Sequence, residues 1–305
     1  MTADALTRID PPDFEKRRTD IAALEDVARR ADGHDALGDT VWRDLAHPGS
    51  DSAGFLVEGR SYVHVARSDG SDTSSWTAGI VRLAGADDPA AITKPLEAAV
   101  THVANHGGRL LTCWVFGATD ADNAPFAAAG FHPARSLFEM RAPLPVAGSA
   151  TLPAGFTLRD FDPGADDAEW LAVNNRAFSR HAEQGGWLES TLRLRMAEPW
   201  FDPTLFLLAF DRDGLAGFNW LKRHEARGPD PAMGEIYVIG VDPRAQGSGL
   251  GRALAVAGLA RVYERGLRVA MLFVAGDNNG AIALYTSLGF TVHRTDRAYV
   301  CQVPA

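Results

Sequence analysis

Residues 234–252 read Gly-Glu-Ile-Tyr-Val-Ile-Gly-Val-Asp-Pro-Arg-Ala-Gln-Gly-Ser-Gly-Leu-Gly-Arg and continue into the apolar segment 253–257. The β-branched residues of 236–241 predict a buried strand. Asp242-Pro243 is a turn signal that ends this strand. The stretch therefore predicts a strand, a glycine-rich loop and a helix in direct succession, and the rest of the fold is interpreted from this unit.

The loop carries three glycines, Gly247, Gly249 and Gly251, which remove side chains where a backbone must approach another group closely. The first turn of the following helix adds unpaired N–H groups and the positive end of the helix dipole. Such a junction binds anions, most simply phosphate. Neither the Gly-x-Gly-x-x-Gly pattern of dinucleotide sites nor the Gly-Lys-Ser/Thr ending of a P-loop is present.

Composition limits the classes of function. The chain has 305 residues, of which 46% are hydrophobic and 23% charged, which is typical of a globular protein of about two domains. A formal charge of -9 argues against nucleic acid or an anionic membrane as a partner. No signal peptide or membrane-spanning run is evident, and Cys113 and Cys301 lie in apolar surroundings typical of buried free thiols. We therefore expect a cytoplasmic protein, either a monomer or a weak homo-oligomer.

Residues 246–251, Gln-Gly-Ser-Gly-Leu-Gly, resemble the Gln-x-x-Gly-x-Gly pyrophosphate loop of the GCN5-related N-acetyltransferases (GNATs). Two further segments carry the resemblance. Glu235 begins the strand before the loop, and residues 277–285 run into Ser-Leu-Gly-Phe at 287–290, a pattern that this family has after its next strand. The resemblance implies acetyl-CoA as the co-substrate.

The remaining pattern predicts an α+β (mixed α/β) fold, in which each domain has a mostly antiparallel central sheet flanked by helices. The expected elements in the first half are helices at 14–30, around 41–45, at 92–104 and at 124–129, a hairpin at 55–65 around Gly59, and strands at 76–83 and 110–116. In the second half they are helices at 166–178 and 188–197, strands at 205–210, 217–222 and 233–241, and a hairpin turn at 211–214.

An internal repeat accounts for this order of elements. Gly130 and Gly289 each precede phenylalanine and are 159 residues apart, and the same offset aligns strand with strand and helix with helix. The chain is predicted to contain two GNAT-like domains, a degenerate one at 1–145 and a catalytic one at 154–305. The linker 146–153 is rich in proline and small residues.

The first copy lacks the predicted anion site. At the same offset, residues 87–92 lie opposite the glycine loop and contain Asp87 and Asp88 but no glycine. These charges would repel a pyrophosphate. Phe126 lies opposite Tyr285 and has no hydroxyl to donate a proton. We expect the first copy to be structural or to shape the substrate pocket.

The C-terminal half is similar to the mycothiol synthase family, whose tandem-domain members acetylate the cysteinyl amine of cysteinyl-glucosaminyl-inositol with acetyl-CoA. The segments that carry this similarity are 174–178, 183–187, 234–243 and 285–290. The chain departs from the family at two places. Phe273 stands where a substrate-binding tyrosine is usual, and Ala275-Gly276 replaces a segment that usually has an acidic residue. These departures leave acetyl transfer to another small amine, such as an antibiotic or a polyamine, as an alternative.

The chemistry of amide formation assigns roles to two side chains. Only the free base of an amine attacks a thioester, so a general base is needed. Glu235 is the carboxylate beside the loop, and the resemblance implies that it acts directly or through water; the alternative is an ordinary capping or salt-bridge glutamate. The resemblance also implies Tyr285 as the acid that protonates the leaving thiolate, although a tyrosine at helical spacing is more often core packing. A backbone N–H near Ile239 or Gly240 can hold the oxyanion.

The resemblance implies the remaining site residues. The backbone of Ile239, Gly240 and Val241 is expected to bind the pantetheine arm as an added strand would. The pyrophosphate is expected on the loop, with Arg244 or Arg252 as an ion-pair partner. The full expected cofactor set is Ile239, Gly240, Val241, Gln246, Gly247, Ser248, Gly249, Leu250, Gly251, Arg252, Asn278, Asn279 and Ala281. The expected substrate set is Asp39, Glu183, Lys222 and Phe273.

Other patterns were weighed against this interpretation. His102 and His106 have the i, i+4 spacing of zinc ligands, but the glutamate of a zincin and a third ligand are missing, so no metal is expected. Cys113 lies in an apolar strand where burial raises a thiol pKa, so covalent catalysis is not expected. A non-catalytic acyl-CoA sensor is the alternative of a different class. Nucleic acid and membrane are not expected partners.

Overall fold

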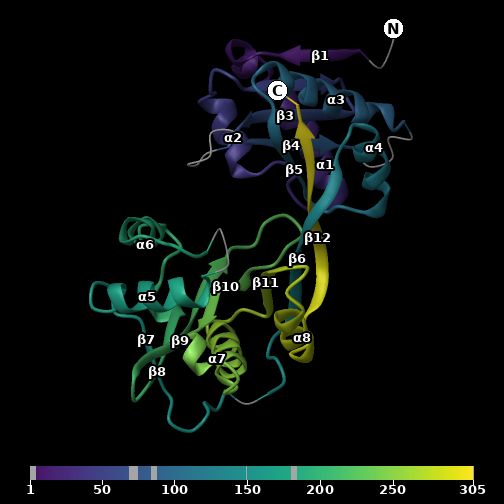
Figure 1. Ribbon diagram of the computed structural model, residues 1–305. Helices are drawn as coiled ribbons and strands as arrows, with labels where there is room; N and C mark the ends of the chain where they lie inside the picture. Colours follow the sequence, from purple (N-terminus) through teal and green to yellow (C-terminus); the bar gives the residue numbers. More distant parts are fainter. Residues whose placement is uncertain (1–4, 69–74, 84–87, 149, 180–183, 305) are drawn as a thin grey trace. The chain divides into compact units, whose positions relative to one another are not determined.

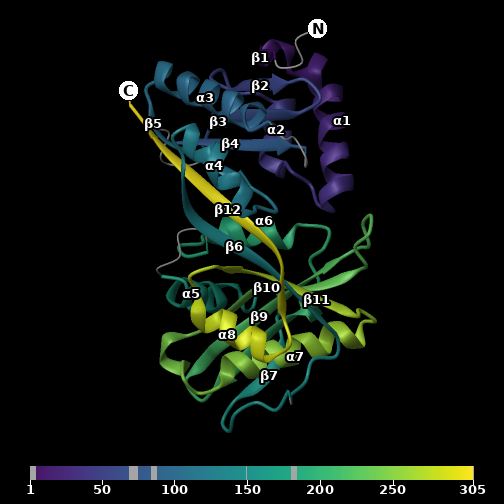
Figure 2. The ribbon, with the colours of Figure 1, turned by 90° about the vertical axis from the view of Figure 1, so that its right-hand side faces the viewer.

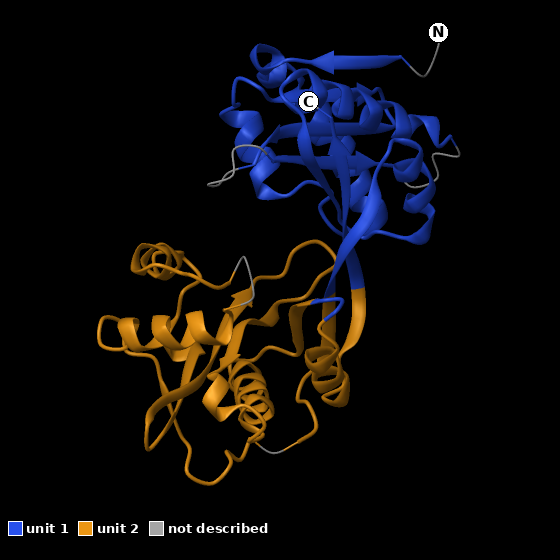
Figure 3. Cartoon of the chain, in the orientation of Figure 1, with its two compact units in different colours: residues 1–138, 275–277, 294–305 blue, residues 139–274, 278–293 orange. Residues whose placement is uncertain are grey.

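The structure is a computed structural model, and it describes residues 5–68, 75–83, 88–148, 150–179 and 184–304. The chain forms two compact units, which are described separately (Figure 3). Unit 1 comprises residues 1–138, 275–277 and 294–305, and unit 2 comprises residues 139–274 and 278–293. None of the described helices is long and apolar enough to cross a lipid bilayer.

The two halves of the sequence repeat one order of elements (Figure 1). The first half contains β1 (Leu6–Ile9), α1 (Phe14–Asp32), α2 (Asp39–Ala46), β2 (Ala53–Val57), β3 (Ser61–Arg67), β4 (Trp76–Arg82), α3 (Ala90–Asn105), β5 (Arg109–Val115), α4 (Asn123–Ala128) and β6 (His132–Pro143). The second half contains β7 (Thr157–Asp160), α5 (Asp167–Ala177), α6 (Glu189–Met196), β8 (Phe206–Asp211), β9 (Gly214–His224), β10 (Met233–Val241), α7 (Leu250–Glu264), β11 (Val269–Ala275), α8 (Asn279–Ser287) and β12 (Thr291–Val303). The predicted tandem repeat and mixed fold are confirmed.

The sheet of each unit is mostly antiparallel, as predicted. In unit 1 the strand order is β1-β2-β3-β4-β5-β12, and in unit 2 it is β6-β11-β10-β9-β8-β7. The parallel neighbours are β4 with β5 and β10 with β11. Tight turns that the sequence predicted join β2 to β3 at Gly59 and β8 to β9 at Gly214, both with positive φ.

Helices cover both faces of each sheet (Figure 2). In unit 1, α3 and α4 pack on one face, and α1 and α2 pack on the other. In unit 2, α5, through Trp170, and α6 pack on an aromatic sheet face that includes Phe218 and Trp220, while α7 packs on an aliphatic face through Leu250 and Leu254. Alternate residues of the central strands supply the two layers, because side chains alternate across a strand.

The final strand of each half completes the sheet of the other half, which the sequence analysis did not predict. Residues 294–303 of β12 belong to unit 1, where β12 pairs antiparallel with β5 from Arg297↔Val115 to Val303↔Arg109. Residues 139–143 of β6 belong to unit 2 as neighbours of β11, and the Leu144 N–H donates to the Arg268 carbonyl at 2.8 Å. The units differ from the predicted domains 1–145 and 154–305 by this exchange. The boundaries of the two folding domains stay a prediction.

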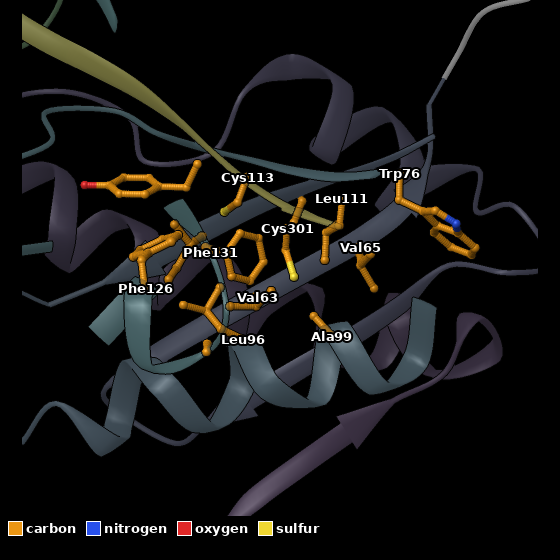
Figure 4. Close-up of a cluster of buried hydrophobic side chains, with 14 of the residues drawn as sticks. Val63, Val65, Trp76, Leu96, Ala99, Leu111, Cys113, Phe126, Phe131 and Cys301 are labelled. Carbon is orange, nitrogen blue, oxygen red and sulfur yellow. The ribbon is translucent and has the colours of Figure 1, made fainter. Parts of the chain in front are cut away.

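The exchanged strand β12 is part of the unit 1 core (Figure 4). Tyr299 is fully buried, stacks on Phe126 with ring centroids 4.2 Å apart, and donates its hydroxyl to Asn123 Oδ1 at 2.9 Å. Cys301 of β12 and Cys113 of β5 are buried in the same cluster as free thiols. Burial raises the pKa of Cys113 to about 12, which makes this thiol a poor nucleophile.

We predict that Tyr299→Ala lowers the free energy of unfolding of unit 1 by about 3–5 kcal/mol, because it removes a buried aromatic ring from a packed core. Tyr299→Phe is the matched control and should cost only about 1 kcal/mol for the lost hydrogen bond. Hydrogen exchange followed by mass spectrometry measures both. Loss of protection in β5 and α3 is expected, and unchanged protection there in Tyr299→Ala would contradict the assignment of β12 to unit 1.

Candidate functional site

The glycine loop of unit 2 follows a strand that separates from its neighbour. β10 pairs with β11 only from Met233↔Val269 to Ile236↔Leu272. The register between β10 and β9 shifts between Ile236 and Val238, which marks a β-bulge at this point. A bulge bends the strand that carries it and increases the local twist. Beyond Ile236, β10 therefore continues along β9 without a partner on its other edge.

The hydrogen-bond pattern shows which peptide groups face this open edge. The Asp242 N–H donates to the Ala216 carbonyl at 2.9 Å, immediately after the register pair Val241↔Gly217. Antiparallel pairs alternate between hydrogen-bonded and non-hydrogen-bonded, so the peptide groups of Ile239 and Val241 point away from β9. The Val241 carbonyl indeed accepts a side-chain hydrogen bond from Gln246 at 3.3 Å.

The same alternation places Gly240 differently from its neighbours. Its register partner on β9 is Phe218, and its N–H falls in the hydrogen-bonded set that faces β9. A Cβ at Gly240 would lie 2.8 Å from the Phe218 ring, so glycine is needed for close packing on the aromatic face. Of the two amides considered for the oxyanion, the Ile239 N–H is the one at the open edge.

The glycine loop has a fixed backbone geometry at the start of α7. Gly247 and Gly249 have φ values of 78° and 84°, which favour glycine, and a Cβ at Gly247 would meet nothing within 4 Å. Ser248 holds the loop itself, because its hydroxyl donates to the Ala245 carbonyl at 2.7 Å and accepts from the Leu250 N–H at 3.3 Å. The exposed amides of the loop and the first turn of α7 are thus fixed before any ligand binds.

Two arginines near this loop differ in availability. Arg244 pairs with Asp211 at 2.5 Å and also donates to two backbone carbonyls, so it is part of the scaffold. Arg252, in the first turn of α7, donates to the neutral Ser287 hydroxyl of α8 at 2.6 Å. The charge of Arg252 is not neutralised by that contact, so of the two arginines Arg252 is the one suited to a phosphate.

The start of α8 presents the predicted asparagines and tyrosine. Asn278 caps the helix, since its Oδ1 accepts from the Ala281 N–H at 3.2 Å, and Asn279 is the exposed first residue. Tyr285 is buried, with its ring 5.7 Å from that of Phe290, and its hydroxyl has no hydrogen-bond partner within the described ranges. Burial raises the pKa of Tyr285 to about 12, so the phenol stays protonated and can act as a proton donor.

Glu235 is a buried carboxylate, only 6% exposed, in the part of β10 that pairs on both edges. Its Oε2 lies 2.7 Å from Nε2 of His224, the last residue of β9. His224 was not among the predicted site residues. The pattern that could have indicated it is the alternation Lys222-x-His224, which places both side chains on the sheet face that Glu235 shares.

Lys222 lies directly opposite Glu235 in the register, but its ammonium is directed elsewhere. Its Nζ lies 4.8 Å from the ring centroid of Trp200 and 5.7 Å from that of Tyr237, and these two rings form an edge-to-face pair. Aromatic faces attract cations at such distances. The Lys222 ammonium is therefore held over these two rings, although its backbone is paired with that of Glu235.

The other predicted substrate residues are more scattered. Phe273 is 40% exposed and follows Leu272, the last residue of β11 that pairs with β10. Asp39 is the exposed first residue of α2 in unit 1, and Glu183 lies outside the described residues. A cavity of about 530 Å³ in unit 2 is lined by residues such as Arg223 and Arg265, and none of the predicted site residues lines it.

The corresponding position in unit 1 is closed. β4 pairs with β5 only from Trp76↔Leu111 to Gly79↔Trp114, so these strands also separate. There, Arg82 and Asp122 form a largely buried bidentate ion pair. Burial alone would raise the pKa of the Asp122 carboxyl, but the hydrogen bond and charge of Arg82 hold it below its ordinary value.

The helix that follows β4 is occupied as well. Asp88 places its own carboxylate at the start of α3, where Oδ1 accepts from the Ala90 N–H at 2.9 Å. Phe126, the counterpart of Tyr285, is buried under Tyr299. In unit 1, these side chains occupy the places that correspond to the glycine loop and Tyr285 of unit 2. The sequence predicted no anion site there.

The histidine pair of α3 has structural contacts. His102 Nε2 lies 2.7 Å from the Asp51 carbonyl oxygen, and His106 Nδ1 lies 2.7 Å from the His102 carbonyl oxygen. Burial lowers the pKa of His102. Over the ranges that the structure describes, no three side chains of histidine, cysteine, aspartate or glutamate are grouped closely enough to hold a metal ion.

Comparison with known proteins agrees with this geometry. The model of the Acetyltransferase (GNAT) family matches residues 170–290, which contain the loop, Glu235 and Tyr285. A GCN5-related N-acetyltransferase from Sphaerobacter thermophilus has a similar fold, with a TM-score of 0.73 and 20% identity over 100% of this chain and 97% of that chain. A tandem GNAT protein from the clavulanic acid biosynthesis pathway gives a TM-score of 0.66 with 16% identity over 99% of both chains.

Curated relatives are similar along the whole chain. Mycothiol acetyltransferase from Thermobispora bispora is 40% identical over 98% of this chain and 99% of its own length. The protein of the same name from Catenulispora acidiphila is 39% identical over 92% and 93%. GNAT membership implies the use of an acyl-CoA. Both copies of the repeat are covered by these alignments, and the chain belongs to the mycothiol acetyltransferase family within the GNAT acetyltransferases.

Proposed function

We propose that this protein transfers an acetyl group from acetyl-CoA to the cysteinyl amine of cysteinyl-glucosaminyl-inositol, the acetylation step that forms mycothiol. The observation that carries the proposal is that one unit holds an open strand edge, a fixed loop of amides, and a buried carboxylate, all along β10. Full-length similarity to mycothiol acetyltransferases supports the choice of acceptor.

In this proposal the cofactor binds to backbone more than to side chains. The pantetheine arm lies along the free edge of β10 and takes hydrogen bonds from the peptide groups of Ile239 and Val241, as an added strand would. The pyrophosphate sits on the amides of residues 247–252, with Arg252 as its ion-pair partner. The Gln246 side chain then has to release the Val241 carbonyl or share it.

Proton transfers occur before and after the amine attacks the thioester. Glu235 takes a proton from the substrate ammonium, directly or through water, and the free amine attacks the thioester carbonyl. The Ile239 N–H, held at the open edge, donates to the oxyanion of the tetrahedral intermediate. Tyr285 then protonates the departing thiolate, because a phenol with a pKa of about 12 is fully protonated at neutral pH. The nitrogen of the tetrahedral intermediate loses its remaining excess proton, through water, to the Tyr285 phenolate, which restores the phenol. The carboxylate of Glu235 is regenerated by loss of its own proton to water.

Charge on the acceptor side suits a polar cationic substrate. Glu235 attracts an ammonium group, and the Lys222 ammonium over Trp200 offers a hydrogen-bond donor for hydroxyl groups. Phe273 supplies an exposed aromatic face but no phenolic hydroxyl. This last feature favours the second candidate, acetylation of a different small amine by the same unit.

Thiol release from acetyl-CoA, measured against a panel of amines, tests the proposal. Cysteinyl-glucosaminyl-inositol should give the highest kcat/KM, with glucosaminyl-inositol, polyamines and aminoglycosides as competitors. A higher value for one of those amines would establish the second candidate. Tight acetyl-CoA binding without turnover of any amine would instead indicate a non-catalytic acyl-CoA sensor.

We predict that Glu235→Gln lowers kcat by roughly 10²–10⁴-fold, the usual contribution of a general base, and leaves the Kd for acetyl-CoA within about twofold. The amide keeps the size of the side chain but cannot accept the ammonium proton. Steady-state kinetics and calorimetric titration measure the two effects. Turnover at the wild-type level would remove Glu235 from the mechanism.

We predict that Gly249→Val weakens acetyl-CoA binding by about 10–100-fold, which corresponds to about 1.4–2.7 kcal/mol. Valine at a φ of 84° is strained and adds bulk among the loop amides. Gly266→Val is the matched control, because Gly266 has a φ of 87° and open space but lies after the other end of α7. Equal losses of affinity in both variants would show that the effect comes from helix stability rather than from the loop.

A further inference from the structure

The contact between His224 and Glu235 carries an inference about the base itself, which rests on the proposed function. His224 ends β9, and its side chain reaches across the register to Glu235 with 2.7 Å between Nε2 and Oε2. The Glu235 side chain is 8% exposed and that of His224 is 31% exposed. The histidine is therefore the more exposed partner of a buried carboxylate.

The direction of this hydrogen bond follows from the chemistry of the two groups. An ionised carboxylate can only accept, so Nε2 must carry the proton and donate it to Oε2. Within the described ranges Glu235 makes no other side-chain hydrogen bond, so Oε1 stays available. One oxygen is fixed and the other is left for an amine.

Lysine is the partner that a strand register would ordinarily give this carboxylate. Lys222 is directly opposite Glu235, yet no ion pair joins them in the part of the chain that the structure describes. The ammonium instead lies over the ring of Trp200. A permanent cation on the carboxylate would oppose proton uptake by the base, whereas a neutral imidazole can orient it at smaller cost.

We propose that His224 is a positioning residue for the reaction: its Nε2–H holds Oε2 of Glu235 so that Oε1 faces the substrate ammonium. It acts through Glu235 and does not touch the reacting atoms. The correct rotamer of the base is then fixed before substrate arrives, and small misplacements of a catalytic group lower the rate strongly. The charged groups beside this contact include Lys222, opposite Glu235 in the register, and Arg195 and Glu198, which act with Glu235 on the pKa of Tyr237.

Kinetics of two variants test the proposal. His224→Ala should lower kcat about 10–100-fold, with KM for acetyl-CoA unchanged. His224→Gln retains an N–H donor and should recover most of the rate. His293→Ala, which removes an exposed histidine of unit 2, should behave as wild type.

A double variant separates positioning from general destabilisation. Adding His224→Ala to Glu235→Gln should cause no further loss of kcat, since the group being positioned is already inactive. An equal additional loss, or a loss in His224→Ala that His224→Gln does not restore, would overturn the proposal in favour of a structural role. Unchanged kcat in His224→Ala would overturn it as well.

Nuclear magnetic resonance gives a readout that does not depend on turnover. In ¹⁵N-histidine-labelled protein, His224 should be protonated at Nε2 at high pH, and its Nε2 signal should shift in Glu235→Gln while that of His293 does not. A His224 ring protonated only at Nδ1 would overturn the inference even in an active enzyme. Failure of the wild type to acetylate any amine, with the expected Nε2 signal present, would overturn the proposed function and leave the positioning contact established.

Discussion

The parallel ladder between β10 and β11 stops after four residue pairs, and the site depends on this stop. Because the bulge after Ile236 bends β10, the peptide groups of Ile239 and Val241 lose a neighbouring strand and remain available for a ligand. Buried backbone groups need hydrogen-bond partners, so an open edge inside a sheet is costly unless something completes it. The open edge of β10 therefore favours the binding of an extended molecule with amide groups next to the glycine loop.

The two copies of the repeat differ in what lies next to the open strand edge. Unit 2 leaves the edge open and has Glu235, the proposed base, on the same strand. Unit 1 has the same strand separation, but Arg82 and Asp122 fill it with an internal ion pair, and Asp88 occupies the start of α3. A pair with its charges this well satisfied would be expensive to break, since either partner alone would be a buried charge. The place in unit 1 that corresponds to the proposed cofactor site of unit 2 is thus occupied by structural contacts, although the order of strands is the same.

Sequence patterns predicted the local elements well and their long-range connections poorly. The strand Met233–Val241 has the predicted boundaries, and the helix Leu250–Glu264 begins at the glycine-rich loop, where the sequence predicted a helix. The bulge at Tyr237 adds one residue to a continuous apolar run, so no pattern reveals it. His224 was missed because its partnership with Glu235 depends on strand register. The role of Lys222 depends likewise on where the segment with Trp200 folds.

The exchange of β6 and β12 has a consequence for biosynthesis. The sheet of unit 1 lacks its β12 strand until residues 294–303 have left the ribosome, although nine-tenths of that unit is translated long before. During translation of the second half, the edge of β5 is therefore unpaired. An unpaired strand edge can bind a chaperone or pair with another chain. Premature termination before Val303 would therefore release a polypeptide whose unit 1 sheet lacks part or all of β12, so the first copy depends on the final strand of the second.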